Sequence, residues 1–209
     1  MKLYLVRHGQ SEGNEGGIGD KLTEIGIEQA KRLGLFLKDK HIDYIYCSLL
    51  GRAKETLNYI NRFFQVPVEY SAELNEMFKG IYEGKTQREH EDFVREQLSL
   101  GKTITEIKPE GGESWLDVEN RAQKLINKIK SKEGINDHVL IVSHSGFLRM
   151  FIIRLMKLNI NEAKYFRIHN ASLSTFELDE NLNVKDFEID DFKHLLKYSS
   201  YEREKVERV

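Results

Sequence analysis

The sequence has 209 residues and a formal net charge of −2 at pH 7, so it is long enough for one domain with a substantial core. The charge balance argues against a nucleic-acid partner held by bulk electrostatics, and a single cysteine, Cys47, excludes an internal disulfide and suits a reducing cytosol. The opening apolar run is too short for a secretory signal, and the most apolar later segment, residues 146–156, is too short to cross a bilayer. We therefore expect a cytoplasmic protein with no membrane partner.

The first predicted element is a short buried strand, residues 3–6, which ends abruptly at Arg7, His8 and Gly9. Gly9 has no Cβ, so its backbone can approach a ligand, and a glycine-rich loop follows it as far as residue 19. Open α/β sheets bind ligands at the carboxyl ends of their strands. This stretch therefore places Arg7 and His8 where chemistry would be expected.

Helical and strand patterns then alternate along the chain. Thr23 is a good N-cap for a helix whose apolar face carries Ile27, Ala30, Leu33 and Leu37. The further predicted elements are a strand at 42–47, a helix at 52–64, an extended piece at 67–70, helices at 86–98 and 115–129, a strand at 138–142, a helix at 146–156, and an edge hairpin at 172–178 and 184–189. This order predicts an α/β fold with a mostly parallel sheet and helices on both faces. We expect one domain over residues 1–209, ending in a charged tail or helix from about 190.

A second strand repeats the layout of the first. The apolar run that begins at His138 ends at His144, and Gly146 follows two residues later. Two strands that each deliver a histidine at the carboxyl end can bring both imidazoles to one pocket. The remaining histidines lack this context, and we expect them to be ordinary surface or core residues.

The resemblance to a known family rests on five sequence blocks. The first is Arg7-His8-Gly9-Gln10-Ser11-Glu12-Gly13-Asn14, and the others lie at residues 48–56, 74–84, 112–114 and 143–146. In this order the chain resembles the histidine phosphatase superfamily, the phosphoglycerate-mutase-like proteins, over residues 1 to about 180. The resemblance implies a phosphoglycerate-mutase-like α/β sheet, a phosphohistidine intermediate, and no required metal or cofactor. The sequence itself has no His, Cys and Asp cluster with the spacing of metal ligands, so we expect no metal site.

The candidate residues fit the chemistry of phosphoryl transfer. The planar forks of Arg7 and Arg52 can each bond two phosphate oxygens. His8 is the expected nucleophile, since close cations lower the pKa of a histidine and so keep it neutral for attack. His144 would be a second donor to the phosphoryl group. Arginines on helices, such as Arg121, are expected on solvated faces.

Other roles rest mainly on the resemblance. Glu76 falls on the family's acid position and would protonate the leaving alkoxide, with Glu83 as a possible neighbour. The predicted phosphate-binding residues also include Ser11, Asn14 and Gly146, although serine and asparagine in such a loop also form turns by bonding their own backbone. Leu50, Leu57 and Tyr82 depart from the residues usual in the family, and we expect them around the rim of the pocket, where they bear on substrate identity.

Three functions stay open at this point. The leading interpretation is a phosphomonoesterase for a small phosphorylated metabolite. A cofactor-dependent phosphoglycerate-mutase-type transfer is the alternative, although the mutases usually carry a longer insertion than the segment between Glu76 and Glu113. A noncatalytic phosphate-binding module would need neither His8 nor Glu76. The segment 82–112 offers Lys85, Arg88, Lys102 and Lys108 for a second acidic group of the substrate, and the oligomeric state stays open.

Overall fold

The computed structural model of the chain describes residues 1–12, 20–132 and 137–195. The strands are β1 (Lys2–Arg7), β2 (Tyr44–Ser48), β3 (Val68–Ser71), β4 (His138–Ser143), β5 (Leu173–Leu178) and β6 (Val184–Asp191). The α-helices are α1 (Glu24–Leu37), α2 (Gly51–Asn61), α3 (Gln87–Ser99), α4 (Trp115–Lys132) and α5 (Ser145–Leu155). Short 3₁₀ helices are η2 (Ala72–Leu74), η3 (Gly80–Tyr82), η4 (Ile160–Tyr165) and η5 (Lys193–Leu195).

The strands form one six-stranded sheet in the order β3-β2-β4-β1-β5-β6. The first four strands in this order are parallel, whereas β5 and β6 form an antiparallel hairpin at the edge. Because β1 and β4 pair with Arg7 opposite Ser143, the residues that follow each strand emerge side by side. The amide of His8 donates to the carbonyl of Ser143 at 3.0 Å. The register thus brings the two predicted histidines to the same end of the sheet.

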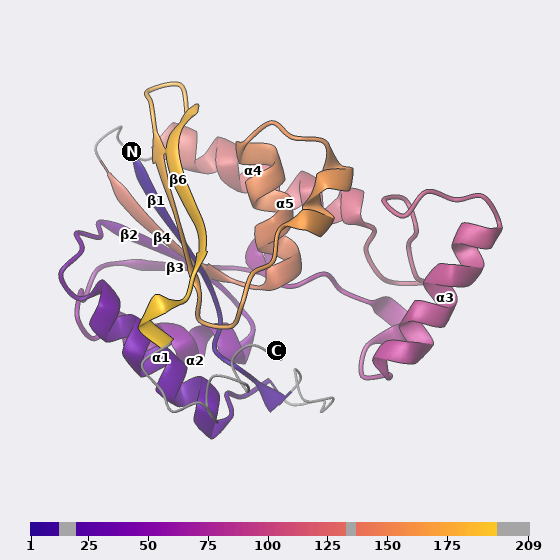
Figure 1. Ribbon diagram of the computed structural model, residues 1–209, viewed down its shortest axis with the longest axis horizontal. Coiled ribbons are helices and arrows are strands. Elements are labelled where there is room, and N and C mark those ends of the chain that lie inside the picture. Colours follow the sequence, from indigo (N-terminus) through magenta and orange to yellow (C-terminus); the bar gives the residue numbers. More distant parts are fainter. Residues whose placement is uncertain (13–19, 133–136, 196–209) are drawn as a thin grey trace.

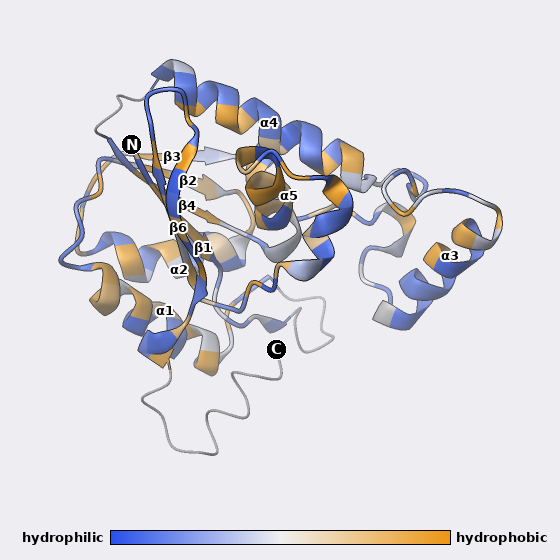
Figure 2. Cartoon of the chain, turned by 45° about the horizontal axis from the view of Figure 1, so that its top comes forward, coloured by the Kyte–Doolittle hydropathy of each residue, from blue (hydrophilic) through white to orange (hydrophobic). Residues whose placement is uncertain are grey.

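Helices cover both faces of the sheet, as Figure 1 shows, with α1 and α2 on one side and α4 and α5 on the other. Alternate residues of the strands explain this arrangement, because Leu3 and Leu5 pack with α4 and α5, whereas Tyr4 and Val6 pack with α1 and α2. In Figure 2 hydrophobic and hydrophilic residues are mixed along α1, α2 and α4, as amphipathic helices require. The predicted α/β fold with a mostly parallel, doubly covered sheet is confirmed.

Local expectations are met in part. The Thr23 side chain accepts a hydrogen bond from the amide of Gly26 and so caps α1, although Ile27 is only half-buried on that helix. Helix α2 ends at Asn61, three residues before the predicted end, and a turn precedes Pro67. At the start of the expected tail, Asp190 and Asp191 still belong to β6 and Leu195 is buried. Residues 196–209 lie outside the described residues.

The segment between η3 and α4 leaves the body of the fold. Figure 1 shows α3 and its flanking loops standing away from the sheet. A capping box between Thr86 and Glu89 begins α3. In the described part of the chain, no helix combines the length and the apolar character that a membrane span requires.

Candidate active site

His8 lies at the end of β1 and is 3% exposed. Its Nδ1 lies 2.7 Å from the carbonyl oxygen of Gly9, which can only accept, so Nδ1 carries the proton and Nε2 keeps its lone pair. The Nε–H of Arg52 donates to this Nε2 over a long 3.3 Å. Burial, followed by the charges of Arg7 and Arg52, holds the pKa of His8 well below its usual 6.5. His8 is therefore a neutral imidazole with an available nitrogen.

Gly9 is needed next to His8 because of backbone packing. A Cβ at Gly9 would lie 2.5 Å from the carbonyl oxygen of Gly26 in α1, and the amide of Gly9 donates to Thr56 Oγ1 at 3.0 Å. The Asn170 side-chain amide donates to the carbonyl of His8 at 3.0 Å. These contacts from three distant segments fix the backbone that carries His8.

His144 faces His8, with ring centroids 4.9 Å apart and planes inclined by 54°. Its Nε2 lies 2.8 Å from Ser48 Oγ, whose own proton goes to Asn75 Oδ1 at 2.8 Å. His144 Nε2 is therefore the donor, and Nδ1 is buried with no hydrogen-bond partner in the described part of the chain. Burial is the largest cause, with His8 and Arg52 next, of a pKa for His144 well below 6.5.

Two arginines flank this pair. Arg7 Nη1 donates to the carbonyl of Ile168 at 2.7 Å, while its buried Nε has no hydrogen-bond partner among residues 1–12, 20–132 and 137–195. Burial lowers the pKa of Arg7 to about 10, so it stays a cation at neutral pH. Arg52 Nη1 pairs with Asp20 Oδ1 at 2.7 Å, and Asp20 also accepts from the amide of Gly51 at the start of α2. Asp20 therefore holds the guanidinium group of Arg52 in an orientation in which its Nε faces His8.

Glu76 reaches the same end of the sheet from the loop after η2. Its Oε2 accepts from the amide of Gly146 at 3.0 Å, and its Oε1 accepts from the amides of Phe147 at 3.2 Å and Met77 at 2.9 Å. Two of these amides belong to the first turn of α5, where backbone donors have no partner within the helix and the helix dipole favours an anion. A Cβ at Gly146 would lie 2.3 Å from Glu76 Oε1, so only glycine leaves room for this contact.

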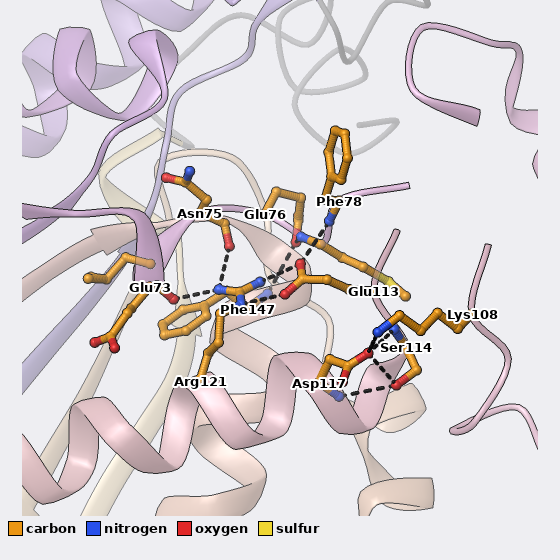
Figure 3. Close-up of polar contacts among 12 residues, drawn as sticks. Glu73, Asn75, Glu76, Phe78, Lys108, Glu113, Ser114, Asp117, Arg121 and Phe147 are labelled. Atoms are coloured by element: carbon orange, nitrogen blue, oxygen red, sulfur yellow. Dashed lines mark hydrogen bonds and ion pairs between the residues drawn. The ribbon is translucent and has the colours of Figure 1, made fainter. Parts of the chain in front are cut away.

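A second layer holds the loop that carries Glu76, as Figure 3 shows. Arg121 of α4 donates from Nη1 to the carbonyls of Glu73 and Asn75, and from Nε and Nη2 to both carboxylate oxygens of Glu113 at 2.7 and 2.9 Å. Glu113 Oε2 also accepts from the amide of Phe78 at 3.0 Å. The chain is thus anchored on both sides of Glu76 by one ion pair.

A model of the histidine phosphatase superfamily (branch 1) matches residues 3–188. The chain belongs to this superfamily. It is 32% identical to the adenosylcobalamin/alpha-ribazole phosphatase of Salmonella typhimurium, over 86% of this chain and 92% of that protein. It is 30% identical to a 2,3-bisphosphoglycerate-dependent phosphoglycerate mutase of Cytophaga hutchinsonii, over 87% of this chain and 90% of that protein. The crystal structure of the alpha-ribazole phosphatase from Shigella flexneri superposes with a TM-score of 0.81 at 29% identity, covering 91% of this chain and 96% of that one.

In this histidine phosphatase the structure brings together five of the predicted site residues: His8, His144, Arg7, Arg52 and Glu76. Ser11 is buried at the start of the loop, and Asn14 lies outside the described residues. The amide of Gly146 already donates to Glu76. Within residues 1–12, 20–132 and 137–195, no group of three or more His, Cys, Asp and Glu side chains is arranged to hold a metal ion.

Other expected neighbours lie elsewhere. Glu83 is exposed and accepts from the amide of Lys79, and Tyr82 packs against Phe93 of α3 at 4.9 Å between ring centroids. Leu57 is fully buried between α2 and the sheet, so it is a core residue and the expectation of a rim position was wrong. Lys108 pairs with Asp117 at 2.9 Å.

Sequence reasoning missed Asp20, Ser48, Asn75 and the Arg121–Glu113 pair. Arg121 was expected on a solvated face, but its side chain is only 16% exposed because four hydrogen bonds draw it inwards. The available signal was the position of Arg121 on the apolar side of α4, three residues after the buried Val118 and four before the buried Leu125. Its partners lie 8 to 48 residues away in the sequence, so no local sequence pattern predicts them.

Proposed function

We propose that this protein hydrolyses phosphomonoesters of small metabolites through a phosphohistidine on His8. The observation that carries the proposal is the tautomer of His8, whose Nδ1–H is held by Gly9 while Nε2 keeps its lone pair between two arginines and a second histidine. A neutral nitrogen nucleophile surrounded by cations is suited to attack a phosphoryl group that carries negative charge. A module that only bound phosphate would need no such arrangement, nor a placed carboxylate.

In the first step His8 Nε2 attacks phosphorus, and the bond from phosphorus to the ester oxygen breaks. The weak 3.3 Å hydrogen bond from Arg52 Nε to this nitrogen gives way to the new N–P bond, which frees Arg52 for the phosphoryl oxygens. Arg7 adds a buried Nε–H that has no acceptor among the described residues, and the phosphoryl anion would supply one. When the phosphate group of the substrate enters singly protonated, His144 would take that proton on Nδ1 and hold it as an N–H bonded to a phosphoryl oxygen, since Nε2 is already committed to Ser48.

Glu76 serves as the acid in this step and as the base in the next. Both lone pairs of Oε1 are occupied by the amides of Met77 and Phe147, whereas Oε2 accepts one amide and has one site left for a proton. The departing alkoxide takes that proton. Glu76 then removes a proton from the water that attacks the phosphohistidine, which releases inorganic phosphate, restores neutral His8 and leaves Glu76 protonated again.

Ser11 is proposed as a further phosphate donor from the start of the loop, and Asn14 keeps the same proposed role from the sequence alone. Gly146 was proposed to bind phosphate as well, but its amide could do so only by leaving Glu76. We therefore assign Gly146 to the positioning of the acid. We also propose that residues 1–209 act as one domain in the cytoplasm, without a metal or an organic cofactor.

Mutase-type transfer is the second candidate. The match to a phosphoglycerate mutase covers 90% of that relative, so the short segment between Glu76 and Glu113 does not by itself favour hydrolysis. The names of the relatives support small phosphorylated metabolites as substrates in either case. Inorganic phosphate released in step with the alcohol supports hydrolysis, whereas phosphoryl transfer to an added phosphoglycerate without phosphate release would support the mutase.

The test of the mechanism is rapid-quench labelling with a substrate that carries radioactive phosphate. We expect an acid-labile, alkali-stable adduct on the peptide that contains His8, and none in His8→Ala. His144→Gln removes only a donor, so adduct formation should slow by roughly 10²–10³ without stopping. Label on His144, or full turnover by His8→Ala, would overturn the proposal.

A further inference from the structure

A cavity of about 270 Å³ lies between the middle of α5, the helix η4 and the loop that precedes α4. Its walls include apolar side chains, among them Met150, Ile160 and Ala163, and the ring of Trp115. The lining also holds two neutral polar residues, Thr105 and Asn161, and two cations, Arg149 and Lys164, whereas no acidic side chain of the described residues lines it. The cavity therefore combines a flat apolar surface with positive charge.

Among the described residues, neither cation has an acidic partner. Arg149 forms no hydrogen bond or ion pair within the described part of the chain, and its Nε is buried without an acceptor. Lys164 is exposed, and its Nζ lies 5.1 Å from the centroid of the Tyr165 ring. A partly buried guanidinium without a partner is costly, because a desolvated donor forgoes its bonds to water. An anion in the cavity would remove this cost.

The cavity adjoins the acid of the active site. A Cβ at Gly146 would lie 2.3 Å from Glu76 Oε1 and 3.3 Å from Trp115 Cη2, so the acid and the wall of the cavity flank the same glycine. The charge of Arg149 also contributes to the lowered pKa of Arg7, which places the two guanidinium groups within electrostatic range. Because Glu76 would protonate the leaving oxygen, the cavity lies on the side where the alcohol half of the substrate departs.

We propose that this cavity binds a second anionic group, a carboxylate or a phosphate, on the alcohol half of the substrate. The fork of Arg149 would take two of its oxygens, Lys164 would add charge, and Trp115 would cover an apolar or ring-shaped body. The inference rests on the proposed function for its orientation. It also replaces the earlier expectation for Lys85, Arg88, Lys102 and Lys108, none of which lines this cavity.

The test compares 3- and 4-carboxyphenyl phosphate with phenyl phosphate, which lacks the second charge. We expect wild-type enzyme to prefer at least one carboxylated isomer in kcat/KM, and Arg149→Gln and Lys164→Gln to reduce that preference, by roughly 10- to 100-fold for Arg149. Arg149→Lys keeps a charge but loses the fork and should restore part of the preference. The matched control is Arg154→Gln on the same helix, since Arg154 pairs with Glu119 outside the cavity and should leave the preference unchanged. Hydroquinone bisphosphate, as a parallel substrate, distinguishes a phosphate from a carboxylate as the preferred anion.

Binding measured by calorimetry separates this inference from the proposed function. The probes are benzylphosphonate and 4-(phosphonomethyl)benzoate, neither of which can be hydrolysed. If no ester turns over but the benzoate still binds more tightly in an Arg149-dependent manner, the cavity assignment holds and the hydrolase proposal falls. Suppose that the carboxylated and the uncarboxylated esters both turn over. If Arg149 and Lys164 then raise neither kcat/KM for the anionic substrates nor the affinity for the benzoate probe, the cavity assignment is overturned and hydrolysis stands. Lys164 is exposed, so its variant keeps the test valid should Arg149→Gln fail to fold.

Discussion

The ion pair between Arg121 and Glu113 offers a sharp test of how the acid is positioned. Replacing Arg121 by Met keeps an unbranched side chain beside Phe147 but removes four hydrogen bonds. Glu113, 23% exposed, is then left with an unpaired carboxylate, and two carbonyls lose their donor. Breaking a buried pair costs about 3–5 kcal/mol, and the remaining exposure of both groups puts the expected loss near the lower limit, about 3 kcal/mol. For a domain of this size, that lowers Tm by roughly 6–12 °C.

The same variant should affect catalysis selectively. The anchor points Glu73, Asn75 and Phe78 flank Glu76, so the carboxylate loses its position relative to the leaving oxygen. A misplacement of about 1 Å can cost on the order of 10²-fold in rate. We expect kcat for an alkyl phosphate, which needs the acid, to fall about 10- to 100-fold more than kcat for p-nitrophenyl phosphate.

Thermal unfolding and steady-state assays on Arg121→Met, with Arg154→Met as control, provide the measurement. The Arg154 side chain is 43% exposed and its ion pair spans 3.4 Å, so its loss should cost less than about 1 kcal/mol and leave the ratio of the two substrates unchanged. Adding Glu113→Gln to Arg121→Met removes the stranded charge and should recover part of the stability. Equal losses in the two single variants, or an unchanged substrate ratio in Arg121→Met, would refute the positioning role.

Three other outcomes are expected. Activity should survive EDTA, because Arg7 and Arg52 supply the positive charge that a metal would otherwise provide; loss in EDTA restored by magnesium would contradict this. Glu76→Gln should slow the phosphorylation step far more for alkyl phosphates than for p-nitrophenyl phosphate, and equal losses in single-turnover experiments would remove Glu76 from the acid role. On the acid side of the pH profile, kcat/KM falls as His8 becomes protonated and can no longer attack. After correction for substrate ionisation, this fall should lie below pH 6.5, because burial and the charges of Arg7 and Arg52 lower the pKa of His8. Arg52→Gln removes one of these charges, so the fall should move to higher pH; a fall that stays in place would show that Arg52 does not act on His8.

Much of the fold was decided locally. Apolar runs of four to six residues that end in Arg7-His8-Gly9 and in His144 indicated two buried strands with chemistry at their carboxyl ends. Alternating strand and helix periods predicted the parallel sheet, and the clean alternation at 172–178 predicted the edge hairpin. These patterns are visible in the sequence because burial on a sheet face or a helix face imposes a period on consecutive residues.

The sequence by itself therefore determined the family, the covered sheet and the approach of two histidines to one end of it. Tertiary structure decided the rest: the tautomers of His8 and His144, the capture of Glu76 by the first amides of α5, and the inward turn of Arg121. The partners in these contacts are mostly tens of residues apart, and a hydrogen bond between distant segments leaves no period in either. The same holds for the cavity at Arg149, whose lining comes from residues 104–115, 149–150 and 160–164, which only the tertiary structure brings together.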